Sequence, residues 1–287
     1  MKKARIAVVA LAVLMLFAAV SCKEPHVHEF SKEWTSDASN HWHECECGEK
    51  ADEVAHVYGD PQVKGDKVVH VCDECDYEEE IKGAVAVGTE EALKKAIEDG
   101  VANIYLSENV DLHEGLVIRK SVKLDLNGKK LENVVALDSH PKYFTVLSIV
   151  DGASLILRNG TIKAMDNDCY AINVKNGELV VESGKIIGNV SAIQVQKGKL
   201  KILGGEFSIV QTWPTANDPA GTLYTINCID ANYKDGTAVV SIEGGLFKNF
   251  NPMNCFAEGA NTNFLADGYK TTSKDIDGTT WWTVEKN

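Results

Sequence analysis

A repeat of 21 residues between Tyr170 and Val210 constrains the fold more than any other feature of the sequence. The stretch from Tyr170 reads YAINVKNGELVVESGKIIGN, and the stretch from Ser191 reads SAIQVQKGKLKILGGEFSIV. Short runs of alternating apolar residues recur in both copies, with glycines at the same places. A fixed period in the low twenties built from such runs is typical of a β-solenoid, in which each coil buries its apolar side against the next.

The same pattern extends beyond the two copies, with offsets that reveal loops between the coils. Leu155 precedes Leu179 by 24 residues, and Val240 follows Leu200 by 40 residues. The residues in excess of 21 are expected in loops, because the strands themselves keep their alternation. Since alternate side chains of a strand point to opposite sides, we expect Leu179 to stack on Leu200 in a shared interior.

Both ends of the repeat region carry their own signals. Thr89 and Gly100 suit the N-cap and the left-handed C-terminal position of one short helix. Its apolar residues fall on one stripe: Ala92, Leu93, Ala96 and Ile97. Such a helix would cover the open core of the first coil. At the far end, Asp277 and Gly278 predict the turn of a closing hairpin.

The helix and the segments IYLSEN and SVKLDLNGK resemble the opening of right-handed parallel β-helices of the pectin-lyase-like type. The resemblance covers about residues 83–287. It implies a mainly β fold, a right-handed single-stranded parallel β-helix with an N-terminal capping helix. We expect a small Cys/His module, a β structure stapled by metal, to precede it. The resemblance is specific for fold and weak for function, because unrelated functions share this architecture.

Residues 26–75 hold six of the eight histidines and four of the eight cysteines. The pairs Cys45-x-Cys47 and Cys72-x-x-Cys75 have the close spacing of zinc-ribbon knuckles. Two thiolates on one tight turn can occupy two positions of a tetrahedral zinc site. We therefore expect a structural zinc ion held by these four cysteines.

Other arrangements of the module stay open. Histidines offer alternative ligands, namely His28, His43, His56 and His70. In an oxidising compartment the four cysteines could instead form two disulfides, and some staple is expected because so small a module has little core. The module resembles a Cys/His repeat of bacterial surface proteins with the pattern W…HWHxCxxCG…H…CxxCxY, although Cys45-x-Cys47 is one residue shorter.

The first 21 residues have the organisation of a signal peptide. The basic segment MKKAR precedes an uncharged run of 15 residues, IAVVALAVLMLFAAV, which is shorter than the ~20 residues of a spanning helix. The junction before Cys22 resembles a bacterial lipoprotein signal, although Ala19 replaces the usual leucine. The alternatives are an ordinary secretory signal or a single membrane anchor.

The resemblance implies a lipid on Cys22 that anchors the protein to a membrane of the cell envelope, periplasmic or surface-exposed. The predicted domains are therefore a signal peptide at 1–21, a zinc-ribbon-like module at 22–82 and a β-helix at 83–287. The net charge of −13 argues against nucleic-acid binding, which needs a basic surface.

The sequence favours binding over catalysis. A glycoside hydrolase needs two carboxylates that face one cleft, and the nearest pair, Asp166 and Asp168, has no matching acids in neighbouring coils. No nucleophile motif, phosphate loop or cofactor fingerprint occurs. A divergent carbohydrate-active enzyme, either a polysaccharide lyase or a glycoside hydrolase, is the alternative.

A candidate binding residue is Trp213, which lies in an insertion between coils beside Pro214 and Pro219. An exposed tryptophan can stack on a sugar ring or anchor a protein contact, although packing against the coil is equally open. The prediction is a non-catalytic surface for a glycan or a surface protein, with Trp213, Asp166 and Asp168 as candidate contacts. Zinc capture by the His-rich module is a further hypothesis.

Overall fold

The computed structural model describes residues 27–134, 145–165, 170–211 and 223–287. Cα packing divides the chain into two compact units, Met1–His56 and Val57–Asn287. The sequence-based boundary between residues 82 and 83 stays a prediction. Among the residues described, no helix combines the length and the apolar character that crossing a bilayer requires.

The first unit contains an antiparallel sheet in the order β1-β2-β3. Its strands are β1 (Phe30–Ser36), β2 (Asn40–Cys45) and β3 (Lys50–Ala55). The carboxylate of Asp37 accepts the N–H groups of Ser39 and Asn40, which closes the turn between β1 and β2. Trp42 on the central strand is buried, and the ammonium group of Lys50 lies 3.3 Å from the centre of its ring.

The second unit begins with another small antiparallel sheet, in the order β4-β5-β6. Its strands are β4 (Gln62–Lys64), β5 (Lys67–Val71) and β6 (Glu78–Glu80). Val68 and Val69 of the central strand are buried. The turn between β5 and β6 carries Cys72 and Cys75, so it corresponds to the second cysteine pair of the sequence.

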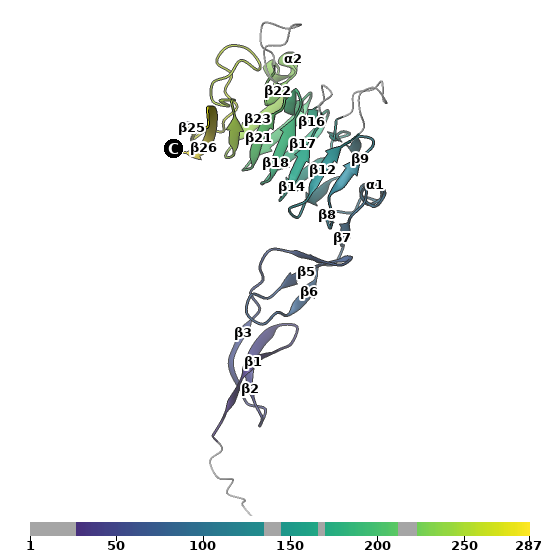
Figure 1. The fold of residues 1–287 in the computed structure, drawn as a ribbon, viewed down its shortest axis with the longest axis vertical. Coiled ribbons are helices and arrows are strands. Elements are labelled where there is room, and N and C mark those ends of the chain that lie inside the picture. The colour runs from purple at the N-terminus through teal and green to yellow at the C-terminus, as the bar shows by residue number, and fades with distance from the viewer. Residues whose placement is uncertain (1–26, 135–144, 166–169, 212–222) are drawn as a thin grey trace, which may run out of the picture. The chain divides into compact units, whose positions relative to one another are not determined.

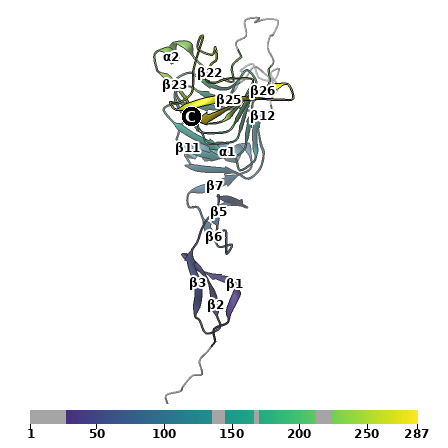
Figure 2. The same cartoon turned by 90° about the vertical axis from the view of Figure 1, so that its left-hand side faces the viewer.

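Long parallel sheets make up the rest of the second unit and confirm its mainly β, β-helix-like character (Figure 1). The chain visits three sheets in turn, so successive strands of each sheet belong to successive coils, which Figure 2 shows from the C-terminal end of the stack. The five-stranded sheet contains β10 (Leu116–Ile118), β13 (Leu147–Ile149), β16 (Tyr170–Val174), β19 (Ser191–Val195) and β22 (Ile226–Cys228).

The other two sheets are longer. The seven-stranded sheet contains β7 (Ala84–Val87), β8 (Asn103–Leu106), β11 (Val122–Asp125), β14 (Ser154–Arg158), β17 (Gly177–Val181), β20 (Gly198–Ile202) and β23 (Ala238–Ile242). The eight-stranded sheet contains β9 (Val110–Leu112), β12 (Lys130–Asn133), β15 (Thr161–Lys163), β18 (Lys185–Gly188), β21 (Glu206–Ile209), β24 (Leu246–Lys248), β25 (Tyr269–Ile276) and β26 (Thr279–Lys286).

The observed register matches the alignment of the repeats. Leu155 pairs with Leu179, Leu179 with Leu200, and Leu200 with Val240 across neighbouring strands. The three leucines are fully buried in one continuous apolar core. The offsets of 24, 21 and 40 residues in the sequence are therefore confirmed as successive coils.

A helix and a hairpin flank the coils at the predicted places. The helix α1 (Glu90–Asp99) begins after Thr89, whose hydroxyl accepts the N–H of Ala92, and it ends at Gly100 with a φ of 80°. Leu93, Ala96 and Ile97 of α1 belong to the same core as the coils. The strands β25 and β26 form the expected hairpin, and β26 runs antiparallel to β24. A second short helix, α2 (Asp230–Lys234), precedes β23.

Candidate metal centre and binding surface

A cluster of two cysteines and one histidine lies in the first unit. Cys45 ends β2, and Gly48 donates its N–H to the carbonyl of Cys45 at 2.7 Å, so Cys45 and Cys47 share one tight turn. The Nδ1 atom of His28 lies 3.2 Å from Cys47 Sγ. The ligand atoms of His28, Cys45 and Cys47 all lie within 4.8 Å of one another.

These separations suit a metal ion. A tetrahedral zinc ion with bonds of about 2.0–2.3 Å spaces its ligands roughly 3.5 Å apart. Cys45 is buried, whereas Cys47 and His28 are exposed. A hydrogen bond with the Cys45 thiol raises the pKa of Cys47. Metal binding to these thiols would therefore release protons.

Two histidines form another pair in the first unit. The Nδ1 atoms of His41 and His56 are 3.5 Å apart, and His41 is buried. Nε2 of His56 lies 2.8 Å from the carbonyl oxygen of Asp37. Because a carbonyl only accepts, Nε2 carries the proton, and the lone pair of a neutral His56 lies on Nδ1. A hydrogen bond of this kind determines which ring nitrogen can bind a metal.

The second unit contributes the knuckle of Cys72 and Cys75. The N–H of Cys72 donates to the carbonyl of Tyr77 at 2.9 Å, and Asp76 has a φ of 58°, so the chain turns sharply there. The two sulfur atoms lie within 4.8 Å of each other. Burial raises the pKa of Cys75, and the neighbouring Cys72 raises it further. This turn can supply two thiolate ligands.

The structure thus brings together each predicted cysteine pair and adds histidines to the donor set. The zinc site of Cys45, Cys47, Cys72 and Cys75 stays a prediction. His28 joins the first pair, whereas His43 stacks on Trp34 with ring centres 3.9 Å apart.

Two further histidines of the module complete the comparison. The ring centres of His70 and Tyr58 are 5.6 Å apart. His41 was not predicted as a ligand, although its place two residues before His43 on one strand was a usable signal. The six cysteines that the structure describes are all thiols.

Cys22, Asp166, Asp168 and Trp213 lie outside the described residues.

The outward side of the five-stranded sheet carries a row of uncharged polar residues. The parallel register aligns them as Ser148, Asn173, Gln194 and Asn227. The first three are screened from solvent, and Nδ2 of Asn227 donates to Oε1 of Gln194 at 2.9 Å. Oδ1 of Asn173 is buried and has no hydrogen-bond partner among the described residues.

This polar row differs from the outer sides of the other sheets, which carry ion pairs such as Lys201–Glu243 and Lys185–Glu206. A buried acceptor without a donor costs about 1–3 kcal/mol, so such an atom points to a water molecule or a ligand group. The sequence analysis missed this row. The recurring Ser, Asn, Gln and Asn at matching positions of the coils were a usable signal.

A second buried polar group lies near the C-terminal coils. Glu258 is 4% exposed, and its Oε1 accepts the N–H of Cys228 at 2.6 Å. Burial raises the pKa of Glu258, and burial also raises the pKa of the Cys228 thiol. Cys255 is buried too, and burial raises its pKa to about 11. Both thiols therefore stay protonated near neutral pH and are poor nucleophiles.

No protein-family model matches the chain, and neither the curated proteins nor the solved structures include a match.

Proposed function

We propose that this chain is a non-catalytic lipoprotein of the bacterial cell envelope, periplasmic or surface-exposed, whose β-helix binds a glycan. In this proposal Cys22 carries the lipid, the Cys/His-rich module holds structural zinc, and residues 83–287 form a right-handed β-helix of the pectin-lyase-like type. The α1 helix serves as the cap of its first coil.

The uncharged polar row of the five-stranded sheet is the observation that carries the glycan assignment. Asn227 is the partly exposed end of this row, and its side-chain amide can bond to sugar hydroxyl groups. The uncharged neighbours in the row suit a neutral polar ligand better than a charged one.

A glycan array probed with the purified chain tests this assignment. We expect saturable binding to a defined glycan, with about a tenfold loss in Asn227→Ala because a hydrogen bond to the sugar disappears. Ser241→Ala, on the outward side of β23, is the matched control and should bind normally. Equal binding by both variants would refute the assignment. Release of sugar from a polysaccharide would instead support the alternative of a carbohydrate-active enzyme.

The close packing of thiol and imidazole groups supports the zinc assignment. Two soft sulfur ligands and an imidazole suit zinc better than magnesium or calcium, which prefer oxygen ligands. The first unit has few buried apolar side chains, and a bound metal would contribute directly to its folding.

Elemental analysis combined with a thiol count tests the zinc assignment. We expect bound zinc in the full chain and selective loss of structure around Trp34 and Trp42 when a chelator removes it. Loss of metal in His28→Ala, but not in His43→Ala, would identify His28 as a ligand, since His43 stacks on Trp34. A module with no reactive thiols and no metal would show that disulfides hold it instead.

Detergent-phase partition tests the lipid anchor. The mature protein is expected in the detergent phase and Cys22→Ala in the aqueous phase, because acyl chains contribute about 0.8 kcal/mol per buried methylene. Intact mass after cleavage distinguishes a lipidated Cys22 from the product of an ordinary secretory signal.

A further inference from the structure

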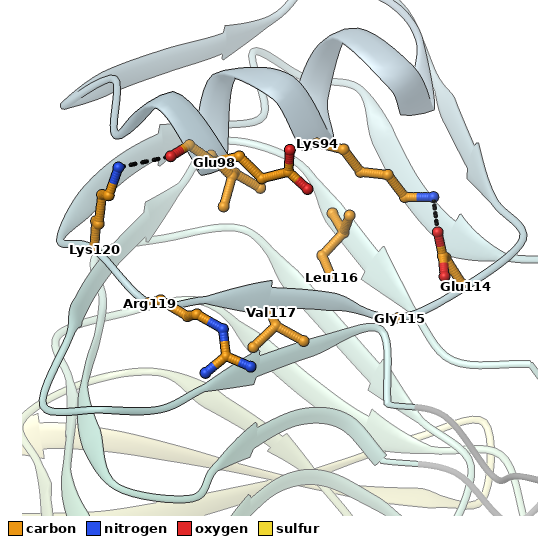
Figure 3. Close-up of a pocket in the computed structure, with 9 residues that line it drawn as sticks. Lys94, Glu98, Glu114, Gly115, Leu116, Val117, Arg119 and Lys120 are labelled. Atoms are coloured by element: carbon orange, nitrogen blue, oxygen red, sulfur yellow. Dashed lines mark hydrogen bonds and ion pairs between the residues drawn. The ribbon is translucent and has the colours of Figure 1, made fainter.

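A cavity of about 400 Å³ lies between α1 and β10, and Figure 3 shows the helix on one side and the strand on the other. Ile97 and Glu98 line it from the helix, and the residues from Glu114 to Val117 line it from β10 and the segment just before it. β10 is an edge strand, because it ends the five-stranded sheet and pairs there with β13. The cavity therefore borders an open strand edge.

The backbone of β10 presents hydrogen-bonding groups to this cavity. The N–H of Leu116 donates to the carbonyl of Val146 at 2.9 Å, and the carbonyl of Ile118 accepts the N–H of Val150 at 3.0 Å. Alternate residues of a strand direct their backbone groups to opposite sides. The N–H and C=O groups of Val117 therefore point away from β13, toward the open edge. An extended polypeptide is the ligand that matches a donor and an acceptor at this spacing.

Three cations also line the cavity. Lys94 pairs with Glu114 and Arg119 pairs with Asp151, whereas Lys120 donates to the backbone carbonyl of Glu98.

The carboxylate of Glu98 has no ion-pair partner in the described part of the chain. Figure 3 shows this side chain on the side of α1 that faces β10. A basic side chain in the ligand could therefore pair with this carboxylate.

We propose that this cavity receives an extended segment of a partner protein, which adds to β10 as a further strand and carries a basic residue that pairs with Glu98. Main-chain hydrogen bonds to Val117 hold the segment, and its alternate side chains pack on Ile97 and Leu116. The site is distinct from the polar row of the five-stranded sheet and does not depend on glycan binding.

Fluorescent, end-blocked heptapeptides of alternating valine and lysine test this proposal by anisotropy with the full chain. A second peptide has glutamate in place of lysine, and a third has N-methyl groups on alternate amides, which block strand pairing. We expect saturable binding of the first peptide alone. Equal binding of the second or third peptide, or no binding of the first, would overturn the proposal.

Two pairs of variants locate the binding site. Val117→Pro removes the outward N–H without removing a bond to β13, and proline is tolerated on edge strands. We expect about a tenfold loss of peptide affinity in Val117→Pro and less than a threefold change in Val117→Ala. Glu98→Lys should reverse the preference to the glutamate peptide, whereas Glu98→Gln should weaken it.

The test remains decisive if one of these variants misfolds. A reversed preference in Glu98→Lys supports the site even if Val117→Pro misfolds. Unchanged affinity in both Val117→Pro and Glu98→Lys would show that the peptide binds elsewhere and refute the assignment. Normal glycan binding by these variants would separate this site from the proposed glycan surface.

Discussion

Gly198→Ala tests the stacking of the coils at its tightest point. Gly198 begins β20, has a φ of +106°, and lies directly over Gly177 of the preceding coil. A Cβ atom at Gly198 would lie 2.0 Å from the carbonyl oxygen of Gly177 and 2.8 Å from its nitrogen. Real Cβ contacts essentially never fall below 3.0 Å, so the two coils would have to move apart by about 1 Å.

The magnitude follows from two separate costs. A φ of this value lies outside the region where alanine fits, which costs about 1–2 kcal/mol. Moving the backbone by 1 Å weakens two or three ladder hydrogen bonds between β17 and β20, worth about 1 kcal/mol each. Gly198→Ala should therefore lower the free energy of unfolding by about 3–5 kcal/mol.

Gly236→Ala is the matched control. Gly236 has a φ of +78°, and a Cβ atom there would meet no other atom within 4 Å. Only the backbone cost of about 1 kcal/mol applies. Urea unfolding followed by far-UV circular dichroism measures both variants. Equal destabilisation of the two, within about 0.5 kcal/mol, would refute the argument that contact between coils requires glycine at Gly198.

Three further predictions concern polar groups. Burial raises the pKa of the Glu90 carboxyl group, but hydrogen bonds from Lys94 and His113 outweigh it and hold this pKa at about 2, below its ordinary value of 4.5. Its contribution to stability is present above pH 4.5 and is lost as pH falls toward 2, so Glu90→Gln should reduce the drop in melting temperature between pH 5 and 3. Burial raises the pKa of Glu258, so its contribution is lost as pH rises through the folded-state value. Above pH 4.5, Glu258→Gln should reduce the fall of the melting temperature with rising pH. An unchanged slope of melting temperature against pH would contradict this. Asn173→Leu should raise the melting temperature, because it removes a buried acceptor that has no donor, and a lower melting temperature would count against an unsatisfied Oδ1.

Regular features of the coils were predictable because local pattern and tertiary contact agree there. Leu179 and Leu200 occupy equivalent places in the repeat, and parallel pairing between successive coils aligns them. The helix ends at Thr89 and Gly100 were also predictable, since capping depends on neighbouring residues alone.

The metal-binding residues were only partly predictable. Cys45 and Cys47 lie together because their separation along the chain is short. The approach of His28, 19 residues before Cys47, depends on how the strands of the first unit pair. No local pattern specifies such a contact, so the sequence could offer His28 only as an alternative ligand.

Sequence alone determined the period of the coils, the alternation of inward and outward residues and the places of the capping residues, because each depends on short-range geometry that repeats along the chain. Tertiary structure alone decided which polar side chains became buried and which strands became sheet edges. The acceptor of Asn173 and the carboxyl group of Glu258 are buried although both are polar, and β10 ends its sheet beside α1. The physical reason is that burial and strand pairing depend on segments that are distant in the sequence.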